Sequence, residues 1–184
     1  MDFKNVSDVL NGFAQYVVDS SKNNLTADKK GGGDLYNSIK YTYEKSEDMF
    51  LLDFLMEDYG PFVDKGVRGL TSTYPETASA LSKFQYGSGT GPKNGLRDGI
   101  KKWVAEKRFQ FRDKKTGRFM SYESTAYIIA RSIYNKGLKA NLFFTQPFEQ
   151  SLKSLQIDLK DSFKLDIESG IILGSDKIVN LKVT

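Results

Sequence analysis

The strongest constraint on this sequence is an apolar stripe of helical period at each end of the chain. The stripes recur every three or four positions, which places their members on one face of a helix. The first consists of Phe3, Val6, Leu10, Phe13 and Val17. The second consists of Phe148, Leu152, Leu155, Leu159, Phe163 and Ile167, and it lasts as far as Gly170. The sequence therefore predicts two long amphipathic helices, each of which must bury one face.

The C-terminal stripe also admits a second interpretation, because several of its members fit the period of a strand. These are Ile157, Leu159, Phe163, Leu165 and Ile167. We favour the helix because its pattern begins earlier and runs longer, and because Pro147 suits the first turn of a helix. Beyond this helix, residues 171–184 are expected to form a short strand or an extended arm.

Two segments between the stripes have the pattern of strands. Residues 35–43 place apolar and polar side chains on opposite faces, and residues 49–56 are apolar on both faces. The short charged segment 44–48 would join them as an antiparallel hairpin, whose second strand needs cover on both sides. The chain is thus predicted to be an α+β protein, with a small antiparallel β-sheet packed by long N-terminal and C-terminal helices.

A helical and loop insertion is predicted at about residues 67–122, within a single domain of residues 1–170. It contains a helix over 94–107 and a hairpin-like turn at 113–117, where Phe109, Phe111 and Phe119 are expected to pack inward. The glycines 87, 89 and 91 indicate a flexible loop, because they lack the neighbouring elements of a phosphate-binding motif.

Two further helices are predicted beside the insertion. One helical turn should follow Pro61 and end at Gly66, since glycine favours the residue after a helix. A longer helix is expected over 123–136, again with a glycine, Gly137, at its end.

The composition removes several classes of function. The chain has no Cys, which excludes disulfides, thiolate nucleophiles and zinc–thiolate sites, and it has no His, which excludes a Ser-His-Asp triad. Four carboxylates near one another in sequence leave a hydrolase as an alternative: Asp53, Glu57, Asp58 and Asp64. Solvated or interface charges are commoner at such positions. We therefore predict a protein that is not an enzyme and has no cofactor or metal.

Charge is unevenly distributed along the chain. The net charge is +4, but residues 1–60 carry −5 and residues 61–184 carry +9. Most of the excess lies in a basic segment, residues 93–118, whose cations outnumber Asp98, Glu106 and Asp113 by seven. The cations are Lys93, Arg97, Lys101, Lys102, Lys107, Arg108, Arg112, Lys114, Lys115 and Arg118. Such a segment is either a solvated surface or a surface for an acidic partner or nucleic acid.

No membrane span is expected, because the mean hydropathy is −0.45 and no apolar run approaches 18 residues. The beginning of the chain does not have the basic-then-apolar pattern of a signal peptide, so secretion by that route is not indicated.

Three motifs resemble those of the tail-completion and neck (head–tail connector) proteins of tailed bacteriophages, the HK97 gp10-like group among them. They are the segment Gly-Asp-Leu-Tyr-Asn-Ser-Ile at 33–39, the segment Tyr-Gly-Pro-Phe-Val-Asp-Lys-Gly at 59–66, and a Pro-Phe pair that opens the last helix. The residues that carry the resemblance are Leu35, Ser38, Ile39, Tyr59, Phe62, Val63, Asp64, Gly66, Pro147 and Phe148. The chain departs from the family pattern at Asp64, where Glu is usual, and in its longer insertion.

The resemblance implies a structural virion protein. Family members assemble as rings, often of six or twelve copies, at the junction of head and tail, and the ring continues the channel through which the genome leaves. The implied partners are copies of the chain itself, portal or adaptor proteins and other tail rings, with weak contact to genomic DNA. Assembly would take place in the host cytoplasm. The alternative from the residues alone is a nucleic-acid-binding module that uses the basic segment.

Overall fold

The structure, a computed structural model, describes residues 3–28, 31–46, 49–71, 82–88 and 95–181. The chain forms two compact units. The first contains residues Met1–Gly60 together with Phe143–Thr184, and the second contains Pro61–Leu142. The insertion predicted at about 67–122 falls within the second unit. The predicted α+β class is confirmed.

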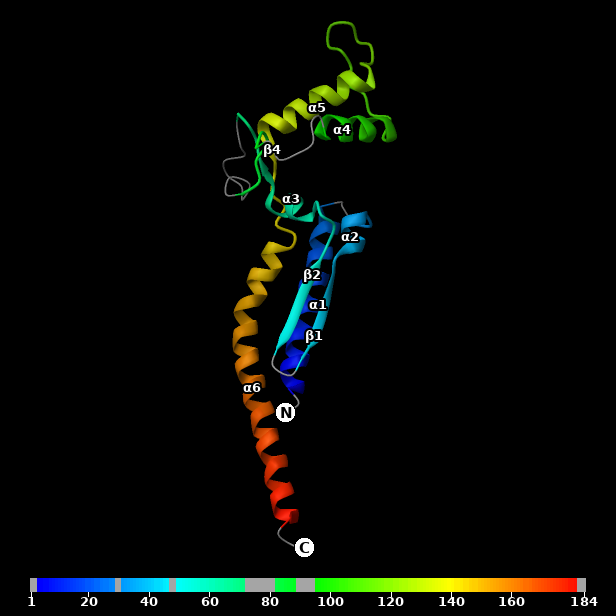
Figure 1. The fold of residues 1–184 in the computed structure, drawn as a ribbon. Coiled ribbons are helices and arrows are strands. Elements are labelled where there is room, and N and C mark those ends of the chain that lie inside the picture. The colour runs from blue at the N-terminus through cyan, green and yellow to red at the C-terminus, as the bar shows by residue number, and fades with distance from the viewer. Residues whose placement is uncertain (1–2, 29–30, 47–48, 72–81, 89–94, 182–184) are drawn as a thin grey trace. The chain divides into compact units, whose positions relative to one another are not determined.

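The first unit consists of two long helices and a β-hairpin (Figure 1). Helix α1 (Lys4–Ala27) lies antiparallel to α6 (Thr145–Leu181) and also contacts the hairpin of β1 (Lys40–Lys45) and β2 (Phe50–Leu55). The apolar stripe of α1 faces this interior, where Val6, Val17 and Leu25 are almost fully buried. The two predicted terminal helices thus exist and pack on each other, although Leu152, Phe163 and Ile167 of the second predicted stripe remain 36%, 41% and 44% exposed.

Aromatic rings fill the space between these three elements. Phe13 of α1 meets both Phe54 of β2 and Phe148 of α6, with ring centroids 6.2 and 5.7 Å apart. Phe3 packs in the same way between Phe50 of β2 and Phe163 of α6. Edge-to-face pairs of this kind add to the burial of apolar area, so part of the high aromatic content of the sequence stabilises this core.

The hairpin differs from the prediction in two respects. The expected strand over 35–43 is divided, since α2 (Asp34–Ser38) is a short helix and the strand begins at Lys40. Leu35 and Ile39 are both buried, and their spacing of four suits a helical turn as well as a strand face. Asp34 favours the helix because an acidic side chain stabilises a helix N-terminus.

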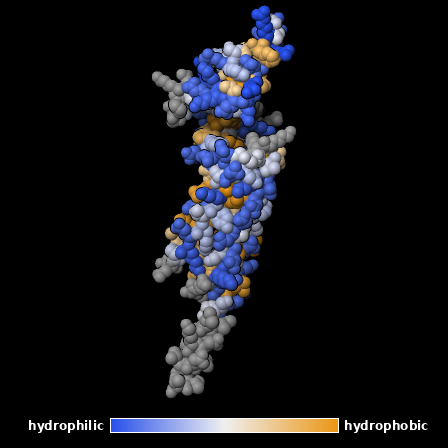
Figure 2. All heavy atoms as spheres, turned by 90° about the vertical axis from the view of Figure 1, so that its right-hand side faces the viewer, coloured by the Kyte–Doolittle hydropathy of each residue, from blue (hydrophilic) through white to orange (hydrophobic). Residues whose placement is uncertain are grey.

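The second difference concerns the face of β2 that points away from α1. Residues 49–56 were expected to be covered on both sides, yet Leu51 and Leu55 are 39% and 41% exposed, and Met49 is 58% exposed. Within the described residues the hairpin has only two strands, paired with Lys40 opposite Leu55 and Tyr43 opposite Leu52. Apolar side chains consequently lie among hydrophilic ones on the surface of this unit (Figure 2).

Helix α6 is longer than predicted. The segment from residue 171 onward, expected as a strand or arm, continues the helix to Leu181. The physical reason is that one glycine inside a helix costs only about 1 kcal/mol, which is too little for Gly170 to end it.

The second unit begins within α3 (Gly60–Lys65), the predicted single helical turn, which ends at Gly66 with a φ of 70°. It continues through β3 (Val67–Arg68), α4 (Gly95–Glu106), α5 (Tyr122–Lys136) and β4 (Gly137–Leu138). Helices α4 and α5 pack on each other, while β3 and β4 pair antiparallel. The helices predicted over 94–107 and 123–136 are thereby confirmed within one or two residues.

Two local signals define α5. The side chain of Ser121 accepts a hydrogen bond from the backbone N–H of Ser124, which caps the helix N-terminus. Gly137 follows the helix with a φ of 85°, and a Cβ there would overlap the carbonyl oxygen of Val67 in β3. Of the glycines predicted to form a flexible loop, Gly87 has a φ of 84°, and glycines 89 and 91 lie outside the described residues.

Candidate functional site

The predicted basic segment, residues 93–118, divides in the structure into cations that bind within the fold and cations that do not. Lys93 lies outside the described residues. Arg97 and Lys101 of α4 both reach Glu123 of α5, at 3.1 and 3.9 Å, and the Arg97 guanidinium lies 5.7 Å from the ring centre of Tyr127. These two cations therefore hold α4 against α5. Lys102 is exposed on α4.

The remaining cations lie in a basic loop, which we define as residues 107–119. Its six basic residues face a single acidic residue, Asp113, so that the loop carries a charge of +5. Within the described part of the chain none of the six forms an ion pair. They are Lys107, Arg108, Arg112, Lys114, Lys115 and Arg118.

The loop begins with a Schellman motif that ends α4. The backbone N–H of Arg108 donates to the carbonyl of Ala105 at 3.2 Å, and that of Phe109 donates to the carbonyl of Val104 at 2.9 Å. This pattern places Arg108 at the position where glycine is usual, and its φ is indeed 50°. A left-handed conformation costs a residue other than glycine about 1 kcal/mol or more.

The tip of the loop is a tight turn built around Asp113, which confirms the predicted hairpin-like turn. Backbone hydrogen bonds join Asp113 N–H to Arg118 carbonyl and Met120 N–H to Phe111 carbonyl, at 2.9 and 2.8 Å. One carboxylate oxygen of Asp113 accepts from the backbone N–H groups of Lys115 and Thr116 and from the Thr116 hydroxyl. The turn is therefore fixed by hydrogen bonds of its own residues.

The same hydrogen bonds favour the ionised form of the Asp113 carboxyl group. The backbone N–H of Thr116, then its hydroxyl, then the backbone N–H of Lys115 stabilise the charged form and lower the pKa of Asp113. The carboxylate is thus ionised at neutral pH.

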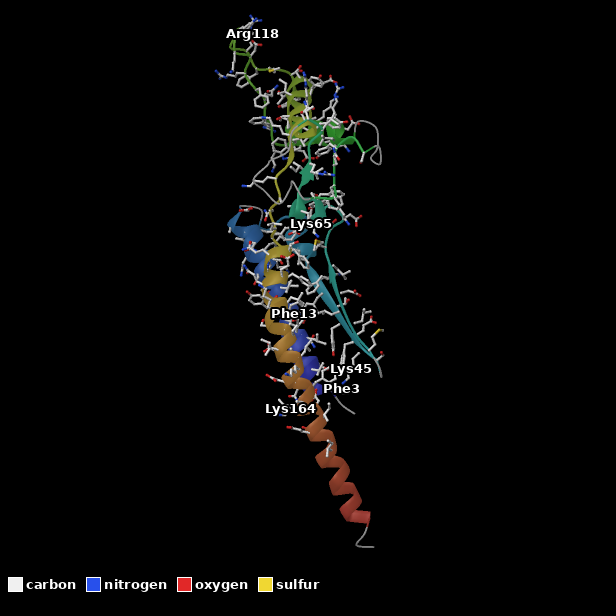
Figure 3. The ribbon with its side chains drawn as sticks, turned by 90° about the vertical axis from the view of Figure 1, so that its left-hand side faces the viewer. Phe3, Phe13, Lys45, Lys65, Arg118 and Lys164 are labelled. Atoms are coloured by element: carbon white, nitrogen blue, oxygen red, sulfur yellow. The ribbon has the colours of Figure 1, made fainter. Side chains whose placement is uncertain are left out.

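The expectation that three phenylalanines of this region pack inward is only partly correct. Phe111 is half-buried, and its ring meets that of Phe109 edge-on at 5.2 Å. Phe119 is 62% exposed, and the guanidinium of Arg112 lies 4.6 Å from its ring centre. Phe109 is also 41% exposed, so two of the three rings lie at the surface beside the cations. Arg118 lies at the end of the loop and points away from both helices (Figure 3).

The residues of the first family-like motif stabilise the first unit. Leu35 and Ile39 are buried beneath the hairpin. The Ser38 hydroxyl donates to the Leu35 carbonyl at 2.9 Å and accepts from the backbone N–H of Glu57 at 3.0 Å, which joins α2 to the end of β2.

The second motif has a similar structural role in the second unit. Asp64 is buried, and its backbone carbonyl accepts from the N–H groups of Asn141 and Leu142 at 3.1 and 2.9 Å. Phe62 packs on Phe84 with centroids 4.4 Å apart, and Val63 is half-buried. Tyr59 is exposed.

The third motif opens α6. Pro147 is buried, and Phe148 stacks on Phe144 at 5.7 Å while also contacting Phe13 and Phe54. The motif residues thus mostly anchor the framework.

The four carboxylates considered for hydrolysis are not gathered into one site. Asp53, Glu57 and Asp58 are exposed residues of the first unit, whereas Asp64 is buried in the second. The described residues contain no group of three Asp, Glu, Cys or His side chains able to hold a metal ion. An open groove of about 450 Å³ between α1 and α6 has Asp158 as its only ionisable carboxylate.

Asp166 is an important residue that the sequence did not single out. Only 3% exposed, it accepts hydrogen bonds from the backbone N–H groups of Asn5 and Val6 at 3.1 and 3.0 Å, and from the Asn5 side chain at 2.7 Å. The start of α1 has no capping side chain of its own. Asp166 lies four residues after buried Ser162 and seven after Leu159, a helical spacing that puts this acid on the same face of the helix as both. That spacing is the sequence signal that could have identified it.

Among the described residues, no helix is both long and apolar enough to cross a bilayer. No protein-family model, curated protein or solved structure matches the chain.

Proposed function

We propose that this chain is a structural virion protein of a tailed bacteriophage that assembles as a ring at the head–tail junction and continues the channel for the genome. The proposal joins the resemblance of the three motifs to one physical observation, the opposite charge of the two units. It makes the chain a binding protein without catalytic activity.

The charge separation is larger between the structural units than between the halves of the sequence. The inserted unit, Pro61–Leu142, has 16 Lys and Arg residues against six Asp and Glu, a net charge of +10. The first unit has 11 against 17, a net charge of −6. Oppositely charged surfaces attract one another between molecules as well as within one. A contact between different surfaces of two copies is heterologous, and such contacts form a ring when the rotation between copies closes.

Exposed apolar side chains offer further area for such contacts. The outer face of β2 presents Met49, Leu51 and Leu55, and α6 presents Ile157, Leu165 and Ile171, all more than a third exposed. Apolar surface of this kind is commonly covered by another protein. The proposed neighbours are other copies, portal or adaptor proteins and other tail rings.

Electron microscopy and light scattering of the purified chain test the proposal. We expect closed rings of six or twelve copies, whose population falls as the salt concentration rises because charge attraction is screened. Incubation with the portal protein of the same phage should give a complex of larger mass. A chain that stays monomeric at about 100 μM in low salt, and that also fails to join portal or tail assemblies, contradicts the proposal.

A further inference from the structure

We infer that the basic loop, residues 107–119, is a binding site for the phosphate backbone of double-stranded DNA. The inference rests on the geometry of the loop in a single chain and does not require that the chain form rings.

The cations of the loop are available to an anionic ligand. None of the six pairs with a carboxylate among the described residues, in contrast to Arg97 and Lys101, which are held by Glu123. The single acid of the loop, Asp113, directs its bonded oxygen into the turn, toward the N–H groups of Lys115 and Thr116. Phosphate contacts by Lys and Arg supply most of the sequence-independent affinity of proteins for DNA.

Arg108 provides an independent observation. It has a left-handed backbone conformation, with a φ of 50°, at the helix-ending position that glycine occupies at lower cost. Its side chain is exposed and forms no ion pair within the described chain, and the two hydrogen bonds of the motif use backbone groups that glycine would supply equally. Backbone outliers of this kind cluster at ligand-binding sites, which supports a binding role for the Arg108 side chain.

The turn also presents its cations in a fixed arrangement. Three hydrogen bonds to Asp113 and the backbone pairs at 113–118 and 111–120 define the conformation between Arg112 and Met120. A loop that is ordered before binding loses less conformational entropy when a ligand binds. Lys114, Lys115 and Arg118 can therefore contact neighbouring phosphates at a low entropic cost.

The charge of the loop favours a duplex, and a single strand is the alternative that its aromatic residues raise. Proteins that bind single strands stack bases on open aromatic faces. Here the Arg112 guanidinium covers one face of Phe119, while Phe109 and Phe111 contact each other. Phe109 and Phe119 nevertheless remain 41% and 62% exposed, so the choice of a duplex rests on the charge of the loop and on the higher phosphate density of a duplex.

The test is fluorescence anisotropy of the full chain with a labelled duplex of about 25 base pairs and random sequence, at salt concentrations from 50 to 300 mM. We expect a dissociation constant in the micromolar range at 50 mM salt, and a linear rise of its logarithm with the logarithm of the salt concentration. Lys114→Gln with Lys115→Gln should weaken binding about ten-fold at 50 mM salt and reduce the salt slope by about two. The matched control, Lys153→Gln with Lys160→Gln on exposed positions of α6, changes the net charge equally and should stay within about two-fold of the unchanged protein.

Arg108→Gly is a second variant that cannot act by unfolding the protein. It should weaken DNA binding several-fold while the thermal midpoint stays constant or rises, since glycine suits the left-handed position. A structural role for Arg108 would lower the midpoint instead.

Four results would overturn the inference. They are an absence of saturable duplex binding at 50 mM salt, an equal loss in the α6 control, tighter binding of the single strand than of the duplex, and unchanged binding by Arg108→Gly. Loss of ring assembly in the Lys114 and Lys115 variant, without loss of DNA binding, would assign the loop to a contact between subunits. If DNA binding fails while rings still form, the proposed virion role stands and the DNA inference fails. If DNA binding is retained while no rings form, the DNA inference stands and the proposed ring assembly fails.

Discussion

A carboxylate oxygen of Asp166 in α6 accepts a hydrogen bond from the backbone N–H of Val6 in α1 at 3.0 Å, across 160 positions of sequence. The N–H groups in the first turn of a helix have no partner within the helix, and an acidic side chain there also interacts favourably with the helix dipole. Asp166 thus supplies from the far end of the chain the cap that α1 lacks.

The first prediction is that Asp166→Asn destabilises the first unit. The amide can accept fewer of the three hydrogen bonds and lacks the charge, so we expect a thermal midpoint lower by several degrees. Circular dichroism at 222 nm measures the loss of the two long helices. The control is Asp161→Asn, one turn earlier and exposed, which should change the midpoint by no more than a typical surface substitution.

The second prediction concerns the stability that Asp166 contributes at acid pH. Desolvation raises the pKa of Asp166, but hydrogen bonds from the N–H groups of Val6 and Asn5 and from the Asn5 side chain, with the charge of Lys45, lower it by more. Because its folded pKa lies below the unfolded value of about 3.9, the stabilisation is present above pH 4 and is lost as the pH falls through the folded pKa. The midpoint difference between the unchanged protein and Asp166→Asn should therefore shrink as the pH falls below about 4. A difference that stays constant below this pH would mean that the charge of Asp166 does not stabilise α1.

The third prediction is that two glycine substitutions change the free energy of unfolding in opposite directions. Gly137→Ala introduces a Cβ that overlaps the Val67 carbonyl oxygen at a φ of 85°, so it should destabilise the second unit by about 2 kcal/mol or more. Gly12→Ala lies inside α1, where a Cβ meets nothing within 4 Å, and should stabilise the first unit by up to about 1 kcal/mol. Chemical denaturation measures both changes in the free energy of unfolding, and changes of the same sign would contradict this backbone geometry.

The fourth prediction separates self-association from folding. Leu51→Glu places a charge on the exposed face of β2 and leaves the inner face, with Phe50 and Phe54, unchanged. Circular dichroism should be unaltered, while the concentration needed for ring formation rises at least ten-fold, because burying an unpaired charge in an interface is costly. Asn23→Glu, an exposed position on α1, is the control with the same added charge. If both variants assemble like the unchanged protein, the outer face of β2 is not part of the contact.

Elements with a sustained period were predictable from the sequence. The stripe from Phe3 to Val17 and the stripe from Phe148 to Ile167 each repeat over several turns, so both helices could be predicted from the sequence. Tertiary contacts decided only which elements they pack against. The positions of Leu35 and Ile39 did not decide between a helix and a strand, because a spacing of four residues suits both a helical turn and one face of a strand. The end of α6 was missed because Gly170 resembles a stop signal whose free-energy cost the rest of the helix overcomes.

The basic segment shows the same limit at the level of the candidate site. Its ten cations are equivalent in sequence, and only the packing of α4 on α5 shows that Glu123 engages Arg97 and Lys101 and leaves the basic loop unpaired within the described chain. The unusual backbone of Arg108 was equally invisible, since nothing in the residue type indicates a φ of 50°.

The sequence by itself determined most of the longer helices, the hairpin and the opposite charges along the chain, because periodicity and composition are local properties that each residue carries into any fold. The tertiary structure alone decided which face of β2 remains exposed, which cations are neutralised and that Asp166 caps α1. These outcomes depend on contacts between residues far apart in the sequence, and such contacts exist only once the helices have packed.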